Sequence, residues 1–117
     1  MTDKTLCIGL TLMLASALQW NVAYANEHTQ EALQHATEAA QSAGDAKAIA
    51  EHASKALKHI EDAKTTSPEM AKKLEKSEAD LKSAVNNASR YNTDSAAKDA
   101  ADAKARLEAI RLSLIHI

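Results

Sequence analysis

The chain has 117 residues, of which 45% are hydrophobic and only 3% aromatic, and its formal net charge is −2. Acidic and basic residues are interspersed and nearly balanced, so the chain lacks the basic stripe that nucleic acids and anionic membrane surfaces attract. A single cysteine, Cys7, excludes an internal disulfide. The length and composition predict one small domain with no nucleic-acid partner.

The first 25 residues predict a secretory signal peptide. A weakly positive start containing Lys4 precedes the apolar run TLCIGLTLMLASAL, and Ala23-Tyr24-Ala25 matches the A-x-A cleavage rule. The apolar run is too short for a membrane-spanning helix. We therefore expect a mature periplasmic chain that begins at Asn26, does not insert into the membrane and contains no cysteine, which excludes thiolate metal ligands.

Residues 26–111 predict an all-α domain of four helices. The helices are expected at about 27–43, 46–64, 68–91 and 94–111. Asn26, Asp45 and Ser67 are the predicted N-caps, Gly44 ends the first helix, and Pro68 occupies the first position of the third. Because the connections are short, neighbouring helices should be antiparallel, which gives an up-down-up-down bundle.

The core of this bundle is expected to be thin, with alanine's helix propensity supplying much of the order. Tyr91, the one aromatic residue between positions 26 and 111, is expected to pack at the end of the third helix. The predicted core leucines are Leu33, Leu57, Leu74 and Leu81.

The last six residues, 112–117, read LSLIHI. This is the translation of CTG TCT CTT ATA CAC ATC, a transposase adapter used in a common sequencing-library kit. We therefore interpret the segment as adapter read-through and exclude His116 from any candidate site.

Two segments 24 residues apart share a histidine pattern. Residues 27–40 read EHTQEALQHATEAA and residues 51–64 read EHASKALKHIEDAK. In each segment two histidines are seven residues apart, which is two helical turns, so both rings lie on one helix face. At the same spacing the third helix has Lys76 and Ser83, so the scaffold repeats further than the histidines do. The four histidines are His28, His35, His52 and His59.

A hairpin folded about Gly44 places these histidines at matching heights. His35 comes level with His52, and His28 comes level with His59. The handedness of the hairpin decides whether the pairs face each other or face the last two helices, and the sequence leaves both arrangements open.

Facing histidine pairs would suit a first-row divalent ion. Neutral imidazole binds Cu(II), Ni(II) and Zn(II) well, and carboxylates or water complete the coordination shell. Glu31 lies within one turn of His28 and His35, and Glu38 lies within one turn of His35. We therefore take the four histidines, with Glu31 and Glu38, as the candidate metal ligands.

The alternative is a non-enzymatic helical interaction module of the cell envelope, with no specific metal and with incidental or pH-responsive histidines. A chaperone for apolar segments has less support, because no large apolar groove is evident. The sequence shows no glycine-rich nucleophile elbow, phosphate loop or H-E-x-x-H motif. We therefore do not expect an enzyme.

Several of these features together resemble the small metal-binding protein (SmbP) family of exported bacterial proteins. They are EALQHATEAA and ASKALKHIEDAK, the seven-residue histidine spacing, the signal peptide and the cysteine-free, alanine-rich helical chain. The resemblance covers roughly residues 26–90, and this chain has fewer histidines than is typical. It implies a periplasmic four-helix bundle that binds divalent metals, chiefly copper. The ligands that it implies are His28, His35, His52 and His59, with Glu31 and Glu38 as helpers.

Overall fold

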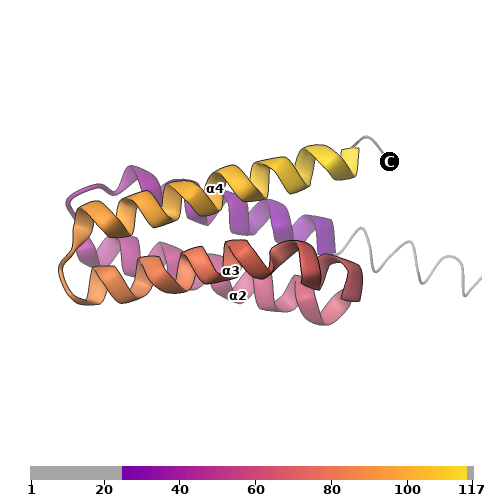
Figure 1. Cartoon of the computed structure of the whole chain (residues 1–117), viewed down its shortest axis with the longest axis horizontal. Helices are drawn as coiled ribbons and strands as arrows, with labels where there is room; N and C mark the ends of the chain where they lie inside the picture. The colour runs from indigo at the N-terminus through magenta and orange to yellow at the C-terminus, as the bar shows by residue number, and fades with distance from the viewer. Residues whose placement is uncertain (1–24, 116–117) are drawn as a thin grey trace, which may run out of the picture.

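The computed structural model describes residues 25–115, with side chains described up to residue 112. Its four helices are residues 25–41 (the first helix), α2 (Ala46–Thr66), α3 (Pro68–Ser89) and α4 (Thr93–Ile115). The first helix and α3 run in one direction, and α2 and α4 run in the other (Figure 1). The prediction of an antiparallel four-helix bundle is therefore confirmed.

Within residues 25–115, no helix combines the length and the hydrophobicity needed to cross a bilayer. The predicted cleavage motif ends at residue 25, so all of the signal peptide except that residue lies outside the described range. His116 lies outside it as well, whereas residues 112–115 continue α4.

The first turn reverses the chain at Gly44, whose φ of 89° belongs to the left-handed region that glycine adopts without strain. The first helix ends at residue 41, two residues before the predicted end. Asp45 caps α2 as predicted, because its carboxylate accepts a hydrogen bond from the backbone N–H of Ala48 at 3.1 Å. Asn26 is not a cap, since the first helix already includes residue 25.

The second turn is a single residue, Ser67. Its backbone N–H donates to the carbonyl of Ala63 at 3.1 Å, which closes α2. Its hydroxyl accepts from the backbone N–H of Met70 at 3.4 Å, and Pro68 follows at the first helical position, where no donor is lost. One residue thus ends one helix and begins the next, which holds α2 and α3 antiparallel.

The third turn depends on a strained residue. α3 ends at Ser89, and Tyr91 reverses the chain with a φ of 61°. Its side chain is 85% exposed. The prediction that Tyr91 packs at a helix end was wrong, because the left-handed backbone of the turn directs the ring into solvent.

Replacing Tyr91 with glycine is expected to stabilise the protein. The left-handed conformation costs a residue with a Cβ about 1–2 kcal/mol, and glycine's greater freedom in the unfolded chain offsets part of the gain, so a net increase of roughly 0.5–1 kcal/mol is expected. Urea denaturation measures it. Tyr91→Ala is the control, because it removes the ring and retains the strain. A glycine variant no more stable than the alanine variant would contradict the assignment of strain.

The buried core is made mostly of alanine, which lets the helices approach closely but removes little apolar surface from water per residue. Leu33, Leu74 and Leu81 are buried as predicted, whereas Leu57 is half-buried and packs against the core. Because the core is so thin, the polar contacts along the seams between helices contribute much of the specificity with which the helices pair. The largest fully buried apolar side chains are Ile49, Ile60, Leu74, Leu81 and Leu107.

A three-residue ion cluster joins α2 to α3. The carboxylate of Glu78 accepts hydrogen bonds from Lys64 of α2 at 3.0 Å and from Lys82 at 3.3 Å. Burial raises the pKa of Glu78, but the two lysine hydrogen bonds outweigh it and hold the pKa below its usual value. The ionised carboxylate is therefore the form that this seam stabilises.

Candidate metal centre

The histidines lie along the seam between the first helix and α2, and they face one another across it. The rings of His28 and His59 have centroids 5.4 Å apart, and those of His35 and His52 are 6.3 Å apart. These are the pairs that folding about Gly44 predicts. Of the two arrangements that the sequence left open, the structure has the inward-facing one.

A glutamate joins each pair and makes two groups of three potential ligands. We call His28, Glu31 and His59 the distal group, because it is farther from the turn at Gly44. We call His35, Glu38 and His52 the proximal group. In both groups, one histidine and the glutamate come from the first helix and the other histidine comes from α2.

In the distal group the two imidazoles are hydrogen-bonded to each other. The Nδ1 atoms of His28 and His59 are 3.1 Å apart, and either ring can be the donor. Glu31 Oε2 lies 2.9 Å from Nδ1 of His59 and 3.8 Å from Nδ1 of His28. The Glu31 side chain is 45% exposed, so this group is open to solvent on its carboxylate side.

In the proximal group the corresponding nitrogens have no such bond. Glu38 Oε2 lies 2.9 Å from Nδ1 of His52 and 3.9 Å from Nδ1 of His35. Both Nδ1 atoms are buried, and neither has a hydrogen-bond partner among the described residues. The 2.9 Å separation between Glu38 Oε2 and His52 Nδ1 is short enough for a hydrogen bond, but its direction is unsuitable for one. The three atoms therefore converge without satisfying one another.

These separations match those expected around a first-row divalent ion. Two ligand atoms that are each about 2.0–2.1 Å from a common ion lie roughly 3 Å apart at 90° and about 4 Å apart at 180°. The measured nitrogen–oxygen distances are 2.9 and 3.9 Å in the proximal group and 2.9 and 3.8 Å in the distal group. The ligand atoms of each group all lie within 4.8 Å of one another. Each group therefore fits an ion held by two imidazoles and one carboxylate.

The surroundings of His35 favour the neutral ring that binds metal. Burial lowers the pKa of His35, Glu38 opposes this effect, and His59, Lys55 and His52 lower the pKa further. Protons therefore compete less well for this imidazole than for one in water. Its lone pair remains available to a metal ion at a lower pH.

The two groups form one continuous row, and its distal end borders a hollow. The rings of His35 and His59 stack with centroids 5.4 Å apart and an interplanar angle of 8°.

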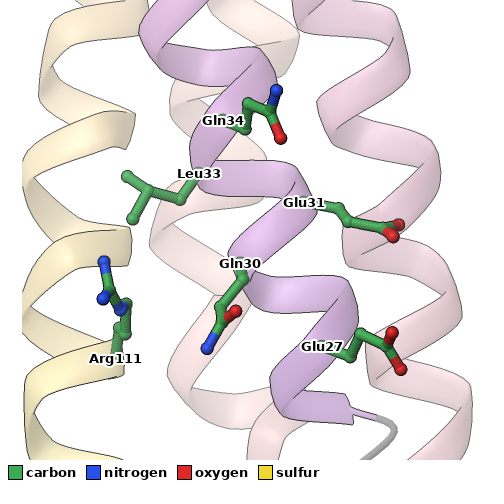
Figure 2. A pocket seen from close by; sticks show the side chains of 6 residues that line it. All are labelled: Glu27, Gln30, Glu31, Leu33, Gln34 and Arg111. Carbon is green, nitrogen blue, oxygen red and sulfur yellow. The ribbon is translucent and has the colours of Figure 1, made fainter.

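A hollow of about 450 Å³ lies against the first helix (Figure 2). Glu31 lines it and projects to one side of that helix, whereas Leu33 and Arg111 of α4 lie on the other side. Glu31 is thus the member of the distal group that borders the hollow.

All six residues that the sequence selected lie in these groups, and each glutamate also contacts a histidine of the other helix. The sequence placed Glu31 within one turn of His28 and His35, and Glu38 within one turn of His35. In the structure Glu31 belongs with His28 and His59, and the shorter contact of each glutamate is to a histidine of α2. Spacing within one helix could not reveal these contacts, because they cross the seam.

The second hairpin has the same seam without the histidines. Ser83 lies 48 residues after His35, and Asp99 lies 47 residues after His52, because the turn at 90–92 is one residue shorter than that at 42–45. Ser83 Oγ and Asn87 Nδ2 each donate to Asp99 Oδ2 at 2.7 Å. Hydrogen bonds thus join α3 to α4 at the position where an imidazole pair joins the first helix to α2.

Comparison with protein families gives a match over most of the chain. A family model described as small metal-binding protein matches residues 3–110, which include both histidine groups and most of the chain. No curated protein and no solved structure gives a significant match.

Proposed function

The chain belongs to the small metal-binding protein family, and we propose that it binds and buffers divalent transition metal ions, chiefly copper, in the periplasm. The observation that carries the proposal is the pairing of four imidazoles across one seam, with one carboxylate beside each pair. Histidine nitrogen is the ligand that Cu(II), Ni(II) and Zn(II) share, and Cu(II) binds a given nitrogen and oxygen site most tightly of the three.

The form of the groups suits reversible binding rather than catalysis or permanent retention. Each supplies only three protein ligands, so water must fill the remaining positions. No carboxylate or histidine of either group is fully enclosed, since their side-chain exposures run from 14% to 45%. We expect micromolar binding with exchange, which is what a buffer or scavenger requires, and no enzymatic activity.

Isothermal titration of Cu(II) at pH 7.4 tests this function. The reference protein carries Cys7→Ser and His116→Ala and no polyhistidine tag, so that neither the thiol nor the fifth histidine contributes. We expect saturable binding of two copper ions. A His35→Ala/His52→Ala variant of the reference should bind one ion fewer, because it loses both imidazoles of the proximal group.

The matched control is Gln34→Ala/Glu51→Ala, which changes the exposed residue immediately before each of those histidines. It should titrate like the reference protein. Copper binding by the double-histidine variant that equals that of the reference would refute the proposed ligands.

A further inference from the structure

The two histidine groups are built from the same residue types but are in different states before any ion arrives. In the distal group the Nδ1 atoms of His28 and His59 are hydrogen-bonded to each other at 3.1 Å. In the proximal group the Nδ1 atoms of His35 and His52 are buried and have no hydrogen-bond partner among the described residues. This contrast has a direct consequence for the order in which ions bind.

An ion that enters the proximal group satisfies two buried nitrogens that no residue in the described part of the chain satisfies. A buried polar atom without a hydrogen-bond partner destabilises the folded protein. When an ion coordinates such an atom, this cost is removed and no existing hydrogen bond is broken. Glu38 stands 2.9 and 3.9 Å from these nitrogens, much as Glu31 stands 2.9 and 3.8 Å from those of the distal group, so these distances do not set the two groups apart. The difference lies in the imidazoles, because coordination of the proximal nitrogens breaks no hydrogen bond between the two rings.

An ion that binds to the distal group must first break the hydrogen bond between the His28 and His59 rings. One of the two Nδ1 atoms carries the shared hydrogen, and this proton has to move to Nε2 of the same ring before that Nδ1 can bind an ion. Glu31 also borders the open hollow, where water competes for its carboxylate. Both effects weaken the distal group relative to the proximal one.

We propose that the proximal group (His35, Glu38 and His52) is the high-affinity site of the protein, and that the distal group (His28, Glu31 and His59) fills second and releases its ion first. This inference rests on the proposed function and adds a ranking to it. The ions concerned are divalent first-row ions that prefer imidazole, with Cu(II) as the probe. The affinities should differ by about tenfold or more, because a buried polar group left unsatisfied costs on the order of 1–3 kcal/mol.

Two matched substitutions in α2 test the ranking. His52→Ala and His59→Ala each remove one imidazole from one group, and the side chains they replace are similarly exposed, at 27% and 24%. Each variant of the reference protein is titrated with Cu(II), and the signal of the first equivalent is followed by electron paramagnetic resonance. We expect His52→Ala to weaken binding of the first ion by at least about tenfold, since even outer-shell changes cost ~10–100-fold. His59→Ala should leave the first ion within about twofold and weaken the second.

A second pair of variants avoids disturbing the stack between His35 and His59. Glu38→Gln and Glu31→Gln change one oxygen to nitrogen without changing shape, and each glutamate belongs to one group only. Glu38→Gln should weaken the first ion and Glu31→Gln the second. The ranking would be overturned if the two variants of either pair weakened the first ion equally, or if His59→Ala or Glu31→Gln abolished binding of the first ion. Metal binding itself would not be contradicted by either result. A reference protein that binds no copper would overturn the proposed function itself.

Discussion

Saturating Cu(II) is expected to raise the melting temperature of the reference protein by about 10 °C or more. A ligand present at 100 times its dissociation constant stabilises the folded state by about 2.7 kcal/mol, and 1 kcal/mol shifts a domain of this size by roughly 4–8 °C. The effect should be large because the metal-free bundle has a core made mostly of alanine. The ligands of each group come from two helices, so the unfolded chain does not hold them together.

Differential scanning calorimetry with and without Cu(II) measures this shift, and Mg(II) serves as the control ion because it prefers oxygen ligands. The variant His35→Ala/His52→Ala should keep only the part of the shift that the distal group provides. An unchanged melting temperature in copper would favour the rival interpretation, in which the chain is a helical interaction module with no specific metal.

The sequence predicted the fold well because the residues that begin and end its helices act locally. A helix start or a chain reversal can be recognised from a few neighbouring residues, without knowledge of the rest of the molecule. Here these residues are Gly44, Asp45, and Ser67 with Pro68. Tyr91 shows where this reasoning fails. An aromatic residue is ordinarily expected to pack, and only the three-dimensional turn reveals that this one has a φ of 61° and faces solvent.

The composition of the site was also predictable, but its internal contacts were not. The seven-residue spacing and the position of Gly44 are enough to pair His28 with His59 and His35 with His52. The inward orientation depends on the handedness of the hairpin, and the hydrogen bond between His28 and His59 depends on side-chain placement. Asp99 was missed as the counterpart of His52 because a shorter turn shifts the repeat by one residue.

Lowering the pH from 7.4 to 5 is expected to weaken copper binding by at least about 100-fold. An imidazole at the reference pKa of about 6.5 is only ~3% neutral at pH 5, so a site that needs two neutral imidazoles loses roughly 1,000-fold. Burial lowers the pKa of His35, against the opposing effect of Glu38, so this ring resists protonation and the loss is smaller than for two free imidazoles. Titrations at pH 7.4, 6.5 and 5 at constant ionic strength measure it.

The lowered pKa of His35 also affects the stability of the metal-free protein, and linkage gives the direction of that effect. His35 binds protons less tightly when folded than when unfolded, so its contribution to stability is present above about pH 6.5 and is lost as the pH falls through the lowered pKa. Urea denaturation of the metal-free reference and of His35→Ala should therefore converge in acid. Copper affinity that does not change between pH 7.4 and 5 would mean that carboxylates bind the ion in place of imidazoles.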